Sequence, residues 1–129
     1  MSVGIVIVTH GSTGASLIQM AEFILGESMA EIRFVPFRQS GDKLTTAEDV
    51  AQAMTAANSG QGVLVLTDLI GASPSNLVAR QLEANDAVMV TGLNLAMLMS
   101  VWNYRGQPLG SLARKAVDSG RRSVKIFQQ

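Results

Sequence analysis

Residues 4–14 read Gly-Ile-Val-Ile-Val-Thr-His-Gly-Ser-Thr-Gly. The apolar part of this segment is short, β-branched and unbroken, which is typical of a strand buried on both faces of a parallel sheet. The polar part begins at His10 and is rich in glycine, as in the turn that joins a first strand to its following helix. The segment therefore predicts a strand that ends at His10, facing a turn and a helix N-terminus.

The remainder of the chain repeats this alternation of strand and helix. Further strands are predicted at 32–37, 63–67 and 87–91. Apolar residues at helical spacing predict helices near 17–24, 47–57, 73–84, 95–103 and 109–119. Strands that alternate with helices indicate an α/β fold with a three-layer, doubly wound sheet of four parallel strands flanked by helices.

Local signals suggest where several of these elements begin and end. Thr45, with Glu48 three positions later, fits a capping box for the second helix. Ser73 followed by Pro74 fits an N-cap with proline at the first helical position. Gly26 fits the C-cap of the first helix. The stretch 123–127 is predicted to be a short final strand.

Length and composition restrict the classes of function. A chain of 129 residues suits one domain, spanning 1–129. Acidic and basic residues balance at 10 each, so no overall field attracts nucleic acid. The absence of cysteine excludes disulfides and thiolate metal sites, and a lone histidine argues against zinc. We expect neither a metal nor a cofactor.

The N-terminus suggests where the protein works. It carries no basic leader, and its apolar run of about six residues is far shorter than the roughly 20 that span a bilayer. We therefore expect a cytoplasmic protein with no direct membrane insertion.

Polar residues follow three of the predicted strands at the carboxyl edge of the sheet, where α/β proteins bind ligands. His10 follows the first strand, Asp68 the third and Asn94 the fourth. A carboxylate that accepts the Nδ1 proton of an imidazole leaves the Nε2 lone pair free to attack phosphorus or a carbonyl. The amides of Gly71 and Ala72, with the Ser73 hydroxyl, are candidates to bind phosphoryl oxygens at a helix N-terminus.

Each of these residues also has a purely structural interpretation. The chain also lacks residues that the motifs of several other kinds of site require. His10 alone can be a hydrogen-bonded strand-end residue, Asp68 an Asx-turn and Ser73 a helix cap. The glycines after the first strand lack the third member of a dinucleotide fingerprint, and no Walker A lysine follows them. A hydrolase with Ser73 as nucleophile lacks the last glycine of the nucleophile elbow and has Pro74 next to the serine.

Taken together, the ordered motifs resemble the IIA component of the mannose-type (mannose, fructose and sorbose) sugar phosphotransferase system over nearly the full length. The motifs are Ile-Val-Ile-Val-Thr-His-Gly at 5–11, Gly-Val-Leu-Val-Leu-Thr-Asp at 62–68, Gly-Ala-Ser-Pro-Ser-Asn at 71–76 and Gly-Leu-Asn-Leu-Ala-Met-Leu at 92–98.

The resemblance implies a phosphohistidine carrier, which is a phosphotransferase activity. In that family the histidine matching His10 accepts a phosphoryl group on Nε2 from the phosphocarrier HPr and passes it to a IIB protein for sugar uptake and phosphorylation. The aspartate matching Asp68 holds the other ring nitrogen, and the loop matching Gly71, Ala72 and Ser73 surrounds the phosphoryl group. The resemblance also implies a homodimer that exchanges an antiparallel C-terminal strand, here 123–127. Association with a membrane permease complex is compatible with this role.

The chain departs from the family at positions that flank the pair. Leu69 and Ile70 stand where many members carry a polar residue and an aromatic one, Ala72 replaces a glycine, and Ala96 stands where proline is common. These departures bear on partner identity more than on chemistry. The alternative function is a stand-alone regulatory module, in which phosphorylation of His10 controls binding to a target protein.

Overall fold

The computed structural model describes residues 1–41, 43–69 and 73–128. Its sheet has four parallel strands in the order β2-β1-β3-β4. They are β1 (Gly4–His10), β2 (Arg33–Phe37), β3 (Val63–Thr67) and β4 (Ala87–Val90). The helices are α1 (Thr13–Leu25), α2 (Ala47–Ala57), α3 (Ser73–Ala79), α4 (Leu95–Asn103) and α5 (Leu109–Arg122), with a 3-10 turn, η1 (Glu83–Asn85). The predicted α/β fold is confirmed.

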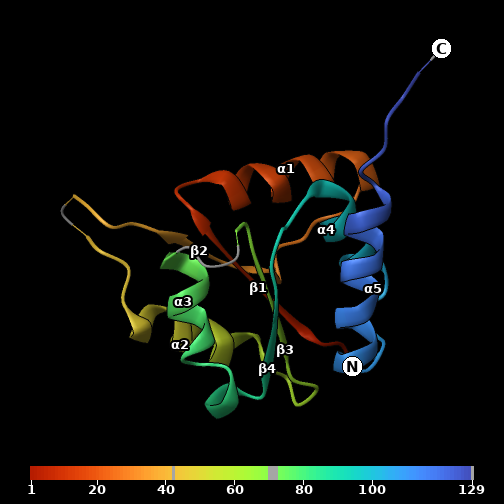
Figure 1. Ribbon diagram of the computed structural model, residues 1–129. Coiled ribbons are helices and arrows are strands. Elements are labelled where there is room, and N and C mark those ends of the chain that lie inside the picture. The colour runs from red at the N-terminus through yellow and green to blue at the C-terminus, as the bar shows by residue number, and fades with distance from the viewer. Residues whose placement is uncertain (42, 70–72, 129) are drawn as a thin grey trace.

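Helices cover both faces of the sheet, which gives three layers (Figure 1). On one face Ile5 and Ile7 of β1 pack in a core with α1, α4 and α5. On the other face Val6 and Val8 pack with α2 and α3. This alternation along β1 follows from the period of two in a strand, and it accounts for the unbroken apolar run in the sequence. Within the described residues, no helix is both long and apolar enough to cross a membrane.

The start of α2 differs from the prediction by one residue. The capping box consists of Thr46 and Asp49: the amide of Asp49 donates to Thr46 Oγ1 at 3.2 Å, and the amide of Thr46 donates to Asp49 Oδ2 at 2.9 Å. Thr45 is unavailable as a cap because its hydroxyl donates to the carbonyl of Pro36 and accepts from the amide of Arg38. The predicted pair of Thr45 with Glu48 was therefore wrong.

This correction predicts different effects on stability for two cap residues. We expect Thr46→Ala to lower the free energy of unfolding by about 1 kcal/mol, the usual effect of removing a hydrogen-bonded N-cap. Ser12, the N-cap of α1, makes no side-chain cap hydrogen bond, so Ser12→Ala should change stability much less. Urea denaturation of the two variants makes the comparison, and equal losses would contradict the assignment of the caps.

The helix predicted from Ser73 to about residue 84 ends earlier, at Ala79. The side-chain amide of Asn85 donates to the carbonyl of Gln81 at 2.7 Å, where the main-chain amide of Asn85 would donate in an α-helix. That main-chain amide donates to Leu82 instead, which tightens the chain into η1. The amide of Gln81 already donates to the carbonyl of Val78, three residues back, so the α-helical hydrogen-bond pattern ends before Asn85.

The C-terminal end also differs from the prediction. Helix α5 continues to Arg122, beyond the predicted end at residue 119. The predicted final strand at 123–127 is not formed in this single chain, where the segment projects past α1 (Figure 1). A strand needs hydrogen bonds to a neighbouring strand, and the described tail has none beside it.

Candidate functional site

The candidate site lies at the carboxyl edge of the two central strands. His10 is the last residue of β1, and Asp68 follows the last residue of β3. Because β1 and β3 are adjacent and parallel, with Val8 opposite Thr67, both residues emerge at the same edge. The sequence predicted this convergence, and the structure confirms that the two side chains meet.

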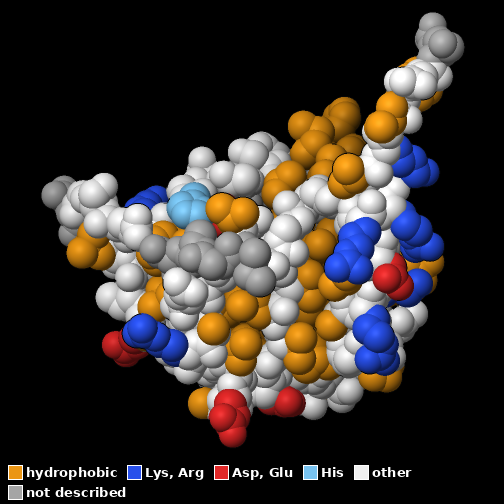
Figure 2. All heavy atoms as spheres, in the orientation of Figure 1, with side chains coloured by type: hydrophobic (Ala, Val, Ile, Leu, Met, Phe, Trp, Pro, Cys, Tyr) orange, Lys and Arg blue, Asp and Glu red, His pale blue; other side chains and the backbone are white. Residues whose placement is uncertain are grey.

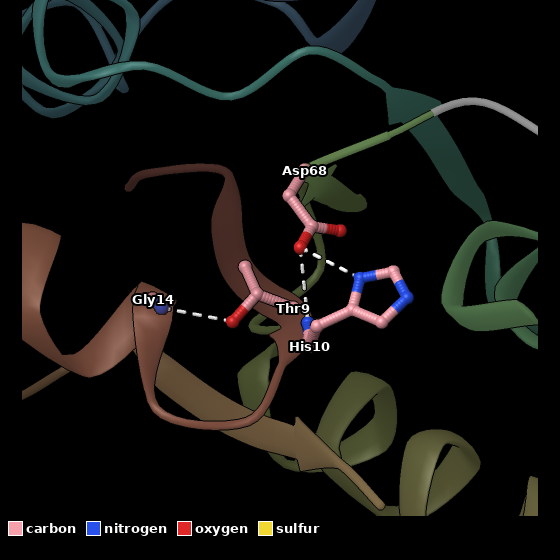
Figure 3. Close-up of polar contacts among 4 residues, drawn as sticks. All are labelled: Thr9, His10, Gly14 and Asp68. Atoms are coloured by element: carbon pink, nitrogen blue, oxygen red, sulfur yellow. Dashed lines mark hydrogen bonds and ion pairs between the residues drawn. The ribbon is translucent and has the colours of Figure 1, made fainter. Parts of the chain in front are cut away.

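Asp68 binds His10 twice through a single oxygen atom. The main-chain amide of His10 donates to Asp68 Oδ2 at 3.0 Å, and the ring atom Nδ1 lies 2.9 Å from the same oxygen (Figure 3). An ionised carboxylate can only accept hydrogen bonds, so Nδ1 carries the proton of this contact. Nε2 lies on the side of the ring away from Asp68 and keeps its lone pair in the neutral tautomer.

The two side chains differ in their exposure. The side chain of His10 is 49% exposed, whereas that of Asp68 is 21% exposed. Figure 2 shows the histidine at the surface, next to apolar side chains. The edge of the Phe37 ring faces the imidazole, with 6.2 Å between ring centroids. The site therefore presents an accessible imidazole on a carboxylate that is largely shielded from solvent.

Hydrogen bonding favours the ionised form of Asp68. Burial raises the pKa of Asp68. The hydrogen bonds from the ring and the main-chain amide of His10 lower it by more than burial raises it, so the net pKa lies below its usual value. Its second oxygen, Oδ1, is buried and has no hydrogen-bond partner among the described residues. A negative charge held beside Nδ1 stabilises positive charge on the ring, such as that which develops when Nε2 attacks an electrophile.

The remaining predicted site residues divide into three cases. Gly71 and Ala72 lie outside the described residues. Ser73 is the first residue of α3 instead of the residue before it.

Asn94 caps α4 by accepting from the amide of Met97, and its amide group donates to the carbonyl of Gly120 and the hydroxyl of Ser123. The structure thus gives Asn94 contacts within the fold.

One polar contact beside the site was missed by the sequence reasoning. The amide of Gly14 donates to Thr9 Oγ1 at 2.8 Å (Figure 3), and Thr9 is fully buried. The sequence analysis assigned Thr9 no hydrogen-bond partner. The strand period carried a signal, because it turns Thr9 toward the face opposite to that of His10.

Comparisons with known proteins bear on the chemistry of this site. The EIIA-man family, described as "PTS system fructose IIA component", matches residues 4–116. The chain is 30% identical over 131 residues to the "PTS system mannose-specific EIIAB component" of Escherichia coli K12. That match covers 99% of this chain and 40% of the relative, so the chain spans about two fifths of the length of the curated protein.

Solved structures share the fold. Phosphotransferase system component EIIA from Streptococcus agalactiae superposes with a TM-score of 0.80 at 25% identity, covering 97% of each chain. The mannose/sorbose specific IIA subunit from Enterococcus faecalis superposes with a TM-score of 0.81 at 20% identity, covering 100% of this chain and 97% of that one. On the extent of the family match, this chain belongs to the EIIA-man family of phosphotransferase system IIA components.

Proposed function

We propose that the protein is a phosphohistidine carrier, in which Nε2 of His10 accepts a phosphoryl group from phosphorylated HPr and passes it to a IIB protein. The observation that carries this proposal is the contact of His10 Nδ1 with Asp68 Oδ2, which leaves Nε2 on the side of the ring away from Asp68 in a half-exposed side chain (Figure 3). Membership of the EIIA-man family supports it.

The proposed transfer has two steps with the same chemistry. The Nε2 lone pair of His10 attacks the phosphorus of the donor's phosphohistidine, the phosphorus–nitrogen bond of the donor breaks, and the donor ring keeps that electron pair. The reverse roles apply when a nitrogen or sulfur nucleophile of the IIB protein takes the group. Asp68 keeps the proton on Nδ1 and offsets the positive charge of the ring in both steps. Transfer of this kind needs mainly positioning and charge compensation.

We assign the loop that follows Asp68 to the phosphoryl group itself. The proposed phosphoryl-binding residues are Gly71, Ala72 and Ser73, which lie between Asp68 and the body of α3 in the chain. Support comes from this position and from family membership. Leu69, which follows Asp68 in the chain, is 59% exposed and offers apolar surface for a protein partner.

The proposal is tested by reconstitution. The purified protein is incubated with phosphoenolpyruvate, enzyme I and HPr, and its intact mass is measured before and after mild acid treatment. We expect an adduct of one phosphoryl group that mild acid removes. A second incubation adds a candidate IIB protein, to which the group should then move. No adduct in the presence of an active donor chain would overturn the proposal.

The second incubation also separates the carrier from its alternative. A relay component must give up its phosphoryl group quickly to a IIB protein, whereas a regulatory module needs only to be phosphorylated. An adduct that forms but persists in the presence of IIB proteins would assign the protein to the regulatory function.

We also propose that two copies pair through their C-terminal tails, residues 124–128. The tail is exposed and carries Val124, Ile126 and Phe127, which are 76–88% exposed. Strand β4 is an edge of the sheet, and a hollow of about 370 Å³ between β4 and α5 is lined by apolar residues such as Val88 and Val117. An antiparallel strand from a second copy would cover both the open edge and this apolar surface.

The pairing predicts that the tail controls the oligomeric state. We expect light scattering to report twice the chain mass of 13.7 kDa for the whole protein and the single chain mass after deletion of residues 124–129. Deletion of Gln128 and Gln129 alone is the matched control and should keep the dimer, because it leaves the three apolar side chains in place. A dimer that survives the longer deletion would place the contact elsewhere.

A further inference from the structure

Helix α1 is capped by a residue of the preceding strand. Its N-cap residue, Ser12, makes no side-chain cap hydrogen bond. The amide of Gly14, in the first turn of the helix, donates instead to Thr9 Oγ1 at 2.8 Å (Figure 3). Thr9 is fully buried and immediately precedes His10. The first turn of α1 is therefore tied to the main chain at His10.

This contact and the Asp68 contact hold two consecutive residues at the end of β1. Ile7 packs on the face covered by α1, and Thr9, two residues later, reaches the same helix. The amide of the next residue, His10, donates to Asp68 Oδ2, just after the neighbouring strand β3. Consecutive residues are thus each fixed by a hydrogen bond to a different element.

The turn between Thr9 and α1 has little room to adjust. Gly14 packs so closely on the sheet that an added Cβ would lie 2.6 Å from a ring carbon of Phe34 and 2.7 Å from Cγ2 of Ile7. Gly11 takes a positive φ of 49°, and its amide donates to the carbonyl of Phe37. Because the helix start cannot move toward the sheet, a change in the Thr9 contact acts on the strand end instead.

We propose that Thr9 is a positioning residue for phosphoryl transfer at His10. Its hydroxyl does not touch the reacting atoms. It fixes the strand end so that the His10 ring stays on Asp68 with Nε2 directed outward. This inference rests on the proposed carrier function and adds a residue to it.

Two substitutions separate the hydroxyl from the shape of Thr9. Thr9→Val keeps the β-branched shape and removes the acceptor, whereas Thr9→Ser keeps the acceptor. In single-turnover phosphorylation by excess phospho-HPr, we expect Thr9→Val to lower the limiting rate constant by about ten- to a hundredfold, as small displacements of a reacting group do. The phospho-HPr concentration that gives half of the limiting rate should change much less, since the docking surface is intact. Thr9→Ser should restore most of the rate.

A spectroscopic measurement tests the same inference without any phosphoryl transfer. Nitrogen-15 shifts of the single imidazole at neutral pH report which ring nitrogen carries the proton. We expect the Nδ1–H tautomer to dominate in the wild type and in Thr9→Ser, and a mixture of tautomers in Thr9→Val. A wild-type protein that takes no phosphoryl group would overturn the proposed function, and these shifts would still decide the role of Thr9.

Ser12→Ala is the matched control, because it alters the same turn at a residue without a cap hydrogen bond. It should leave both the rate and the nitrogen shifts at wild-type values. Wild-type behaviour of Thr9→Val in both measurements would overturn the inference, as would an equal loss in Ser12→Ala. If Thr9→Val fails to fold, Thr9→Ala removes the hydroxyl with less bulk and is subject to the same two measurements.

Discussion

His10→Ala is expected to abolish the acid-labile adduct completely. His10 is the only histidine of the chain, so no second imidazole can take the phosphoryl group in its place. The reconstituted donor chain and the intact-mass measurement described above provide the assay. A variant that still accepts an acid-labile phosphoryl group at the wild-type level would move the acceptor to another residue.

The same variant should remain folded, which makes the loss interpretable. The His10 side chain is half exposed and lies at the end of its strand, so its removal leaves no cavity in either core. Its hydrogen bond to Asp68 is partly screened by solvent, so we expect only a small change in melting temperature. Circular dichroism during heating checks this. A large loss of stability would mean that the site also holds the sheet edge together.

Asp68→Ala is expected to slow phosphorylation by about a hundredfold without stopping it. The aspartate orients the ring through Nδ1 and holds the main-chain amide of His10, but it does not bond to the phosphoryl group. Asp68→Asn is the matched variant, because an amide oxygen can still accept both hydrogen bonds but carries no charge. A rate for Asp68→Asn between those of wild type and Asp68→Ala would separate orientation from charge. A normal rate in Asp68→Ala would refute the role that we assign to this residue.

The charge of Asp68 also predicts a dependence of stability on pH. Burial raises its pKa and hydrogen bonds from His10 lower it, with a net value below the usual 3.8. A carboxyl group whose pKa is lowered by folding stabilises the folded state above the unfolded pKa, and this contribution is lost as the pH falls through the folded pKa. Urea denaturation should therefore show the advantage of wild type over Asp68→Asn at neutral pH and its decrease below about pH 3.8.

Much of the fold was predictable because its signals are local and repeated. The two central strands are buried along nearly their whole length, so β1 and β3 appear as unbroken apolar runs in the sequence. The His10 and Asp68 pair was predictable for a topological reason. Residues that end adjacent parallel strands meet at one edge, whatever lies between them in the sequence.

The errors in the predicted helix ends arose where a group could form its hydrogen bond with either of two local partners. Thr45 and Thr46 both had the chemistry of an N-cap, and contacts to the end of β2 decided which residue was free to act as one. After α3, the amide of Gln81 donates three residues back to Val78, where the longer predicted helix required a bond four residues back. The cap from Thr9 required knowing which face of β1 meets α1. Sequence periodicity places Thr9 on one face of β1, but tertiary contacts decide which partner each of these groups takes.

The use of a single carboxylate oxygen for both contacts with His10 has a consequence for kinetics. With its main-chain amide and Nδ1 both directed to Asp68 Oδ2, the imidazole offers one nitrogen along one line of approach. In the proposed relay, the donor and the acceptor must then approach Nε2 of His10 along the same line, one after the other. One partner leaves before the next arrives, and the order of encounters becomes a ping-pong sequence in which the protein alternates between loaded and empty forms.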